Sequence, residues 1–301
     1  MFHRIYRKIK KAYTKCCSLL SPEFAYWESV RHYYYNRTGK HLDYKHPQNI
    51  NEKLMWLTRY WQHPLVVQCA DKYRVREYVK ICELEHLLVP LIGVWNSAEE
   101  IDFDKLPNQF VLKCNHGCGF NIICKNKRTL DFDKTRNQLN EWLKIDYGKG
   151  EDFELHYSKI KPLIICEEYL PAIGKSVVDY KVQCINGDPF CFLICTDRDT
   201  SGATHSVNLS SYTLEWERVN YLKNESNVNV DKPACIKEML EAAKKLAHPF
   251  PYVRVDFYWV ENKLYLGELT FTPYGNIMEY YKDEVLDAMG ERMKLPKKWK
   301  E

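Results

Sequence analysis

The sequence predicts an α+β fold with mainly antiparallel sheets. Helical patterns with capping residues fill most of the first hundred residues. Two later segments, 177–198 and 252–271, each read as two strands around a short turn, with Asn186-Gly187 as the turn signal in the first. Further helical segments lie at 133–145 and 232–247. Helices and hairpins mixed in this way favour antiparallel sheets covered by helices.

Length and composition are those of a globular protein and exclude several classes. The 301 residues are enough for two or three packed subdomains. A formal charge of +4 is small for this length and does not indicate a nucleic-acid-binding protein. No run of about eighteen apolar residues occurs, so the sequence predicts no transmembrane segment.

Twelve cysteines raise the question of a secreted, disulfide-bonded protein. Four of them lie inside apolar, strand-like runs, where free cysteine acts as a small buried hydrophobe: Cys166, Cys184, Cys191 and Cys195. The basic N-terminus is not followed by the apolar segment of a signal peptide. We therefore expect a protein of the reducing cytoplasm.

The first twenty residues, MFHRIYRKIKKAYTKCCSLL, predict a basic amphipathic helix. Phe2, Ile5 and Ile9 recur at helical spacing, and most of the lysines and arginines lie elsewhere around the helix. Such a helix can make peripheral contact with the anionic inner face of a membrane. The alternative is a terminal helix that packs on its own domain with a solvated basic face.

The elements of the N-terminal part are indicated by their ends. Segment 21–40 has a serine capping signal and a closing glycine, and segment 49–61 repeats this pattern after an asparagine. Segment 70–80 is a further helix with Asp71 as its cap, and 87–95 reads as extended. The expected division is a helical N-terminal region, 1–84, and a core domain, 85–301.

The last hairpin supports the sharpest inference from the residues themselves. If residues 261–263 form a three-residue loop, Asp256 lies directly opposite Glu268. Strand alternation then places five residues on one face: Arg254, Asp256, Tyr258, Glu268 and Thr270. The other face is apolar and should meet the core: Val253, Val255, Phe257, Trp259, Leu269 and Phe271.

Two carboxylates opposed across strands repel each other unless a cation lies between them. Oxygen ligands favour Mg²⁺ or Mn²⁺ over zinc, and Mg²⁺ usually takes one or two carboxylates together with substrate phosphates. Arg254 on the same face suits a phosphoryl group or another oxyanion. The alternative is a surface ladder in which Arg254 neutralises both acids, and a register slip of one residue would separate them.

The loop within residues 110–125, FVLKCNHGCGFNIICK, admits two interpretations. Gly117 and Gly119 permit close backbone approach, so the loop can cradle a phosphate, with Lys113 and Lys125 at the inner ends of the flanking strands. No Walker motif is present, and an ordinary hairpin turn is the commoner explanation of two glycines. The other interpretation is a zinc site, although paired C-x-x-C spacing is missing: Cys114, His116, Cys118 and Cys124.

Five motifs in their order along the chain resemble the ATP-grasp superfamily, and more narrowly the TupA-like ATP-grasp family associated with teichuronopeptide and other surface polysaccharides. They are ADKYRVREYVK, FVLKCNHGCGFNIICK, IICEEYL, VVDYKVQCINGDPF, and VRVDFY with LGELTFTPYG, and they extend from about residue 45 to 282. The resemblance implies an ATP-grasp fold, in which two α+β subdomains clamp a nucleotide. One subdomain, at about 108–165, would be a mobile lid.

The resemblance also implies three sets of nucleotide-binding residues. The set for the phosphates comprises Lys72, Lys113 and the loop from His116 to Asn121. The hinge set, for adenine and ribose, comprises Glu167, Glu168 and Leu170. The set on the following strand comprises Asp179 and Lys181. Each also has an ordinary alternative, as a solvated helix residue, a polar residue at a strand entry or an acid that solubilises a strand end.

By the same resemblance, Asp256 and Glu268 match the magnesium ligands, in agreement with the hairpin register. Many ATP-grasp enzymes have E-x-N here, whereas this chain has Thr270 in place of the asparagine. A threonine hydroxyl can still contact metal or phosphate. The residues nearest the transferred phosphate would be Lys113, Lys181 and Arg254. From its position at the end of a predicted strand, and not from the resemblance, Arg198 is the candidate to hold the acceptor carboxylate.

The implied activity is ATP-dependent ligation of a carboxylate to an amine through an acyl phosphate. The implied substrates are an amino acid and a uronic-acid sugar of a bacterial surface polysaccharide, such as a capsule. Alternatives are a phosphotransferase or a catalytically silent scaffold on the same fold, and a metal-dependent glycosyltransferase. The glycosyltransferase would use a D-x-D pattern, Asp102 to Asp104 or Asp131 to Asp133, but both precede predicted helices, where aspartate is an ordinary cap.

Overall fold

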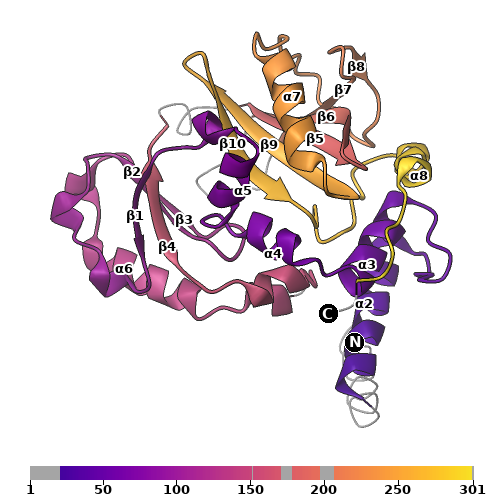
Figure 1. Cartoon of the computed structure of the whole chain (residues 1–301), viewed down its shortest axis with the longest axis horizontal. Coiled ribbons are helices and arrows are strands. Elements are labelled where there is room, and N and C mark those ends of the chain that lie inside the picture. Colours follow the sequence, from indigo (N-terminus) through magenta and orange to yellow (C-terminus); the bar gives the residue numbers. More distant parts are fainter. Residues whose placement is uncertain (1–20, 151, 171–177, 197–206, 300–301) are drawn as a thin grey trace, which may run out of the picture.

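The computed structural model describes residues 21–150, 152–170, 178–196 and 207–299. These residues form two antiparallel sheets with helices packed around them (Figure 1). The predicted basic helix of residues 1–20 and the predicted substrate residue Arg198 lie outside the described residues. Within the described part of the chain, no helix combines the length and apolar character that crossing a membrane requires.

The N-terminal part is helical, as predicted. Helix α2 (Pro22–Thr38) begins after the expected Ser21 cap and ends at Gly39, which has a left-handed φ of 70°. Helix α3 (Ile50–Tyr60) begins at Asn49 with a capping box. The serine, asparagine and glycine signals were therefore correct indicators of the helix ends.

The next segment forms two short helices where one was predicted. Helix α4 (Pro64–Ala70) precedes the predicted one, and α5 (Val75–Ile81) begins after Arg74, not at Asp71. The Asp71 carboxylate accepts hydrogen bonds from the N–H groups of Tyr73 and Arg74 at 2.8 and 3.2 Å. Asp71 therefore caps the turn between the helices, and the prediction that it caps α5 is wrong.

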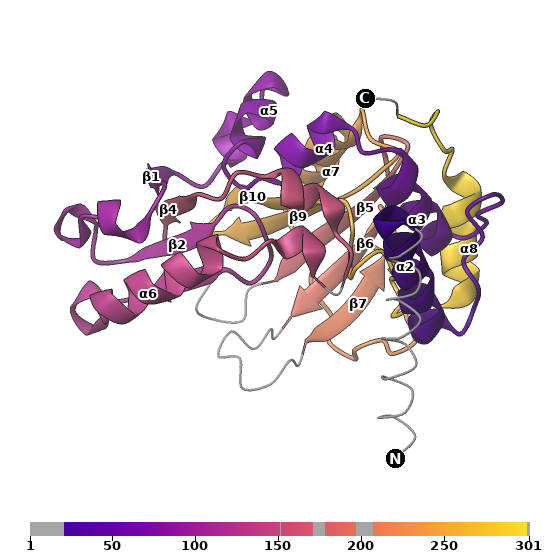
Figure 2. The ribbon, with the colours of Figure 1, turned by 90° about the horizontal axis from the view of Figure 1, so that it is seen from below.

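The smaller sheet has four antiparallel strands in the order β1-β4-β2-β3. They are β1 (Leu91–Trp95), β2 (Phe110–Cys114), β3 (Asn121–Cys124) and β4 (Ile164–Glu168). Helix α6 (Phe132–Leu143) lies along this sheet and contributes Leu139 to its apolar core (Figure 2). The sheet thus includes β1, which lies before the predicted lid boundary at about residue 108.

The larger sheet has six antiparallel strands in the order β10-β9-β5-β6-β7-β8. They are β5 (Asp179–Ile185), β6 (Asp188–Thr196), β7 (Asn208–Tyr212), β8 (Arg218–Val219), β9 (Tyr252–Val260) and β10 (Lys263–Thr270). The remaining helices are α7 (Ile236–Ala247) and α8 (Asp283–Arg292). The described residues also form six short 3-10 turns: η1 (Glu85–Leu87), η2 (Ala98–Glu100), η3 (Phe103–Lys105), η4 (Lys127–Thr129), η5 (Tyr147–Lys149) and η6 (Leu155–Lys159).

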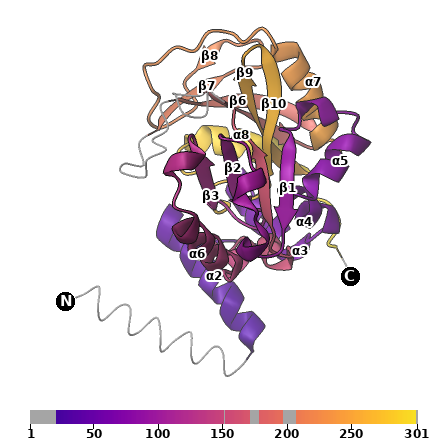
Figure 3. The same cartoon turned by 90° about the vertical axis from the view of Figure 1, so that its left-hand side faces the viewer.

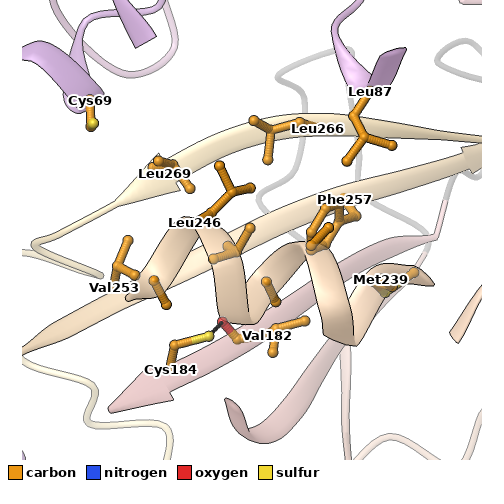
Figure 4. Packing of buried hydrophobic residues seen from close by; sticks show 14 of the residues in the cluster. Cys69, Leu87, Val182, Cys184, Met239, Leu246, Val253, Phe257, Leu266 and Leu269 are labelled. Atoms are coloured by element: carbon orange, nitrogen blue, oxygen red, sulfur yellow. Dashed lines mark hydrogen bonds between the residues drawn. The ribbon is translucent and has the colours of Figure 1, made fainter. Parts of the chain in front are cut away.

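Helix α7 covers one face of the larger sheet. Its buried Met239 and Leu246 join Val182 of β5 and Phe257 of β9 in one apolar cluster (Figure 4). Full burial of each such side chain contributes about 1.5–3 kcal/mol. The residues predicted to face the core from the last hairpin all lie on this side, with Trp259 partly buried at its edge.

The opposite face of the larger sheet is divided into two parts. At one end, Ile185 and Tyr252 pack with residues of α2, α3 and α8 in a second apolar cluster (Figure 1). The polar residues paired across β5, β9 and β10 lie at the other end of this face. The smaller sheet lies on the same side of the larger sheet (Figure 3). The N-terminal helices therefore close one end of this face and leave the polar end to the functional site.

The last hairpin differs from the predicted one in two ways that cancel. Its turn has two residues, Glu261 and Asn262, both with positive φ, and not three. A β-bulge then places Gly267 between the pairs Leu266 with Phe257 and Glu268 with Asp256. The predicted three-residue loop is therefore wrong, but the predicted Asp256–Glu268 pairing is confirmed.

Candidate functional site

Asp256 and Glu268 face each other across β9 and β10 at the polar end of the larger sheet. Asp256 is only 2% exposed. The Glu268 side chain is 35% exposed to solvent. The pair thus has one buried acid and one that a ligand can reach.

Three cationic and hydroxyl groups hold the Asp256–Glu268 pair. Arg254 donates from Nε to Asp256 Oδ1 and from Nη2 to Asp256 Oδ2, at 2.7 Å each, and Nη2 lies 3.3 Å from Glu268 Oε1. Lys181 on β5 donates to Asp256 Oδ2, and its Nζ lies 3.5 Å from Asp179 Oδ2. The Thr270 hydroxyl donates to Glu268 Oε1 at 2.9 Å. Arg254 contacts both acids, as in the alternative of a surface ladder. Lys181, which was predicted to face the nucleotide, contacts Asp256 as well.

The charges in this cluster fix the protonation of its members. Burial alone would raise the pKa of Glu268, but Lys72, Arg254 and Lys181 outweigh it and lower the pKa to about 2. Burial alone would lower the pKa of Lys181, yet Asp256 raises it above its ordinary value. Glu268 is therefore ionised and Lys181 charged at neutral pH.

The carboxylates fit a magnesium ion of the kind that accompanies a nucleotide. The hydrogen bonds from Arg254 and Thr270 both reach Glu268 Oε1, which leaves Oε2 as the oxygen for a cation. Asp256 would join it by exchanging a contact with Lys181 or Arg254. Among the described residues no three acidic, histidine or cysteine side chains cluster as a metal site, so substrate oxygens would have to complete the coordination.

A second charged cluster lies on the smaller sheet. Lys113 on β2 donates a 2.5 Å hydrogen bond to Glu167 Oε2 on β4, and Arg76 of α5 lies 3.4 Å from Glu167 Oε1. The resemblance places Glu167 in the hinge set for adenine and ribose. In the structure, this buried carboxylate contacts two cations, and all three side chains line one pocket.

The glycine loop is fastened to the turn between α4 and α5. Lys72 Nζ donates a 2.5 Å hydrogen bond to the Gly117 carbonyl oxygen. Asn115 is fully buried and donates to the Asp71 carboxylate at 2.9 Å. Gly119 has a φ of +78°, which favours glycine, and a Cβ on Gly117 would lie 2.6 Å from the Tyr147 ring. Both predicted glycines are therefore required by local geometry.

His116 is buried beneath the loop and does not face the phosphate cradle. Its Nε2 lies 3.2 Å from the Trp142 carbonyl oxygen, and its ring contacts Phe120. Burial lowers its pKa, so the ring is neutral. We assign His116 to anchoring the loop.

Glu268 of the first cluster and the charged residues of the second line one pocket between the sheets, with a cavity volume of about 40 Å³. Its charged lining comes from both halves of the chain: Lys72, Arg76, Lys113, Glu167 and Glu268. Apolar residues such as Val75, Leu88 and Leu266 line the rest. A pocket lined by both cations and apolar side chains has the chemistry to bind a phosphorylated ligand with an apolar ring.

Some predicted site residues lie elsewhere. Lys125 follows β3 at the end remote from the loop, because Lys113 pairs with Asn121 and Phe110 with Cys124. The expectation that Lys125 stands at an inner strand end is therefore wrong. Glu168 is exposed on the opposite side of β4 from Glu167, and Leu170 is buried beyond the strand. Asp179 lies beside Lys181, as the sequence pattern indicated.

Two competing interpretations find no support among the described residues. Cys114 and Cys124 pack in the apolar core of the smaller sheet, so the zinc interpretation lacks a gathered set of ligands. The carboxylate of Asp102 accepts from the Asp104 N–H, and that of Asp131 from the Lys134 N–H. Both D-x-D aspartates are therefore helix caps.

Sequence reasoning missed Arg76 and Glu154. Arg76 stands in the quoted segment ADKYRVREYVK at four residues from Lys72, a spacing that places two side chains on one side of a helical turn. Glu154 lies outside every motif. Its buried carboxylate accepts a hydrogen bond from Thr272, just beyond β10. No local pattern could have indicated that contact.

Two antiparallel sheets thus meet at a pocket lined by cations, with the opposed carboxylates of β9 and β10 beside it, as in a fold that clamps a ligand between two sheets. The sequence matches the TupA-like ATP-grasp family model over residues 52–294, and the chain belongs to that family. A search of curated proteins finds no significant match.

Three of the solved structures that match this chain are 13–16% identical to it. D-alanine–D-alanine ligase from Helicobacter pylori is 15% identical with a TM-score of 0.43, covering 75% of this chain and 61% of that one. The ATP complex of the Bacillus anthracis D-alanine–D-alanine ligase is 16% identical with a TM-score of 0.43, covering 74% and 61%. Phosphoribosylamine–glycine ligase from Thermotoga maritima is 13% identical with a TM-score of 0.43, covering 71% and 51%. The chain thus spans between half and two thirds of these proteins.

Proposed function

We propose that the protein is an ATP-dependent carboxylate–amine ligase. One observation carries the proposal: Lys72, Arg254 and Lys181 all act electrostatically on Glu268, and Lys72 and Lys113 line the same pocket as Glu268. Cations gathered in this way suit phosphoryl transfer, which depends on positioning and charge neutralisation.

The reaction has two steps. A carboxylate oxygen attacks the γ-phosphorus of ATP, ADP leaves, and an acyl phosphate forms. The amine nitrogen then bonds to the acyl carbon, and phosphate leaves with one oxygen of the original carboxylate. Lys72 and Lys113 would bind the phosphates, while Lys181 and Arg254 would hold the transferred group. Glu268 and Asp256 would hold a magnesium ion, or manganese in its place, which supplies charge neutralisation at the phosphates.

For the substrates, we propose an amino acid as the amine and a uronic-acid sugar of a bacterial surface polysaccharide as the carboxylate. Support for the polysaccharide comes from membership of the TupA-like family. A basic helix in residues 1–20 would suit work beside a membrane, where such polymers are built on lipid carriers.

Isotope transfer tests this proposal. The protein is incubated with ATP, Mg²⁺, L-glutamate and D-glucuronate carrying ¹⁸O in its carboxylate. An amide product, with one ¹⁸O in the released phosphate, supports the ligase. A stable phosphorylated sugar without amide would indicate a phosphotransferase instead. Turnover of UDP-sugars but not ATP would indicate a glycosyltransferase, and ATP binding without turnover of these substrates would contradict ligase activity on them.

A matched pair of variants ties the activity to the site. Glu268→Gln should lower the rate by about 10²-fold or more, because it removes a carboxylate that would hold the cation neutralising the reacting phosphates. Glu261→Gln changes an exposed acid in the turn of the same hairpin and should leave the rate unchanged. Equal rates in both variants would show that the carboxylate pair is not the reaction centre.

A further inference from the structure

Glu154 is a buried acid beside the reaction centre that the steps above do not use. It lies directly before η6, and its side chain is held by the Thr272 hydroxyl, which donates to Glu154 Oε1. Thr272 follows Thr270 and Glu268 along the chain just beyond β10. The Glu154 carboxyl is therefore fixed close to the end of the strand that carries Glu268.

Two of the charged groups that act on Glu154 belong to the site. Glu268 and Lys72 both act on its protonation, which places it within electrostatic reach of the carboxylate on β10 and of the lysine that contacts the glycine loop. The other titratable groups that interact with it are Asp152 on its own segment, Tyr33 of α2, Tyr147 of η5, Tyr157 of η6 and Cys118 of the loop. His156 lies two residues further along the chain. His156 is neutral, because burial and Lys72 lower its pKa to about 3.

The second step of the ligase reaction needs a proton acceptor. An amino acid arrives with its nitrogen as an ammonium group, which has no electron pair to attack an acyl carbon. The lysines and arginine of the site are already charged and cannot accept a proton. Asp256 is occupied by Arg254 and Lys181, and Glu268 is too weak a base.

Glu154 has the protonation behaviour that this step requires. Burial raises its pKa to about 7, assisted by Asp152 and Glu268 and opposed by the Thr272 hydrogen bond and Lys72. A base with a pKa near the working pH is the most effective proton acceptor. With 8% of its surface exposed, the residue keeps a small opening to its surroundings.

We propose that Glu154 accepts the proton that the amine substrate must lose before it attacks the acyl phosphate. One N–H proton passes to the Glu154 carboxylate, the nitrogen pair bonds to the acyl carbon, and the bond from that carbon to the phosphate oxygen breaks. The second proton leaves with the phosphate, and Glu154 later returns its own to solvent. This role rests on the proposed ligase function.

Hydroxylamine separates the two steps, because it is largely unprotonated at neutral pH and needs no base. With ATP, Mg²⁺ and D-glucuronate, Glu154→Gln should form amide from L-glutamate about 10²–10⁴-fold more slowly than the wild type. Its formation of hydroxamate from hydroxylamine should be almost unchanged. Glu141→Gln, an exposed acid on α6, is the matched control and should behave as the wild type.

The conservative variant Thr272→Val tests the role of Glu154 through the pH profile, which would not change if Glu154 were only structural. The Thr272 hydrogen bond lowers the pKa of Glu154, so Thr272→Val should raise it. The rising limb of the pH profile for amide formation should then move to higher pH, and in Glu154→Gln it should be absent.

The outcomes distinguish this role from the ligase function itself. Wild-type protein that forms neither amide nor hydroxamate overturns the ligase proposal, and the role of Glu154 with it. If the wild type forms both, but Glu154→Gln loses both equally or neither, the ligase stands and the proton-acceptor role is overturned. A pH limb that stays in place in Thr272→Val also overturns that role.

Discussion

Lys72 Nζ donates a 2.5 Å hydrogen bond to the carbonyl oxygen of Gly117, which joins the turn between α4 and α5 to the glycine loop. The same ammonium group lowers the pKa of Glu268 on the other sheet. One side chain thus contacts the loop and acts electrostatically on the opposite wall of the pocket. A bound phosphate would compete with Gly117 for this lysine.

Lys72→Met should therefore weaken ATP binding. Loss of a hydrogen bond to a charged group costs about 1.5–3 kcal/mol, which corresponds to a Kd raised by roughly ten- to a hundredfold. The measurement is the rise in melting temperature with increasing ATP and Mg²⁺. Lys80→Met, on the exposed side of α5, is the control. An unchanged response in Lys72→Met would remove this lysine from the nucleotide site.

The low pKa of Glu268 predicts a specific loss of stability in acid. Its pKa of about 2 in the folded protein lies below the ordinary 4.5, so ionised Glu268 stabilises the fold above about pH 4.5. This contribution disappears as the pH falls towards 2. Urea unfolding across this window should show the wild type losing more stability than Glu268→Gln. Parallel losses in the two proteins would contradict the shift.

Glu154 predicts the opposite trend. Its pKa is raised from 4.5 to about 7, so the folded state holds this proton more tightly than the unfolded state. The resulting stabilisation is complete below about pH 4.5 and is lost as the pH rises through 7. Glu154→Gln, which stays neutral, should gain melting temperature relative to the wild type between pH 5 and 8. A constant difference across that range would show that Glu154 titrates elsewhere.

Gly117→Ala should displace the loop. The added Cβ would lie 2.6 Å from the Tyr147 ring and 2.9 Å from the Phe120 ring, so these side chains or the loop must move. We expect weaker ATP binding with little change in global stability, measured by titration and by urea unfolding. Gly39→Asn, at the end of α2, is the control, because its position has open space and asparagine tolerates positive φ. Equal ATP affinity in all three proteins would mean that the loop does not touch nucleotide.

Asn115→Ala should destabilise the protein itself. Asn115 donates to Asp71 and to the Lys161 carbonyl, and accepts from the Leu163 N–H at 2.7 Å. Its removal leaves buried polar groups without a partner, at a cost of about 2–4 kcal/mol. Urea unfolding measures the loss, with the exposed Asn137→Ala on α6 as control. A loss similar to that of the control would mean that water replaces the amide.

Local signals in the sequence predicted a large part of the fold. Ser21, Asn49 and Gly39 indicate helix ends because caps act within one turn of chain. Asn186-Gly187 indicates its hairpin because few other residues accept positive φ at both turn positions. The pairing of Asp256 with Glu268 followed from alternation along two strands, although the loop and the bulge were both missed.

The remaining parts depend on contacts that no local pattern records. Lys125 was placed beside the loop because the strand direction after a turn was not followed residue by residue. The sequence alone indicates that Glu167 contacts the nucleotide, whereas in the structure its two oxygens contact Arg76 and Lys113. Glu154 joins the site through Thr272, at a sequence separation of 118 residues. Such positions are visible only after the sheets have been assembled.

Because of the bulge at Gly267, the length of the turn in the last hairpin does not by itself decide whether Asp256 and Glu268 are paired. A two-residue turn with the bulge and a three-residue turn without it both bring Glu268 opposite Asp256. The extra residue restores the alternation of faces after the two-residue turn. Leu264 and Leu266 before it point to the apolar core, and Glu268 after it lies on the opposite, polar face. Related chains could therefore lengthen the turn by one residue and lose the glycine, with the carboxylate pair preserved.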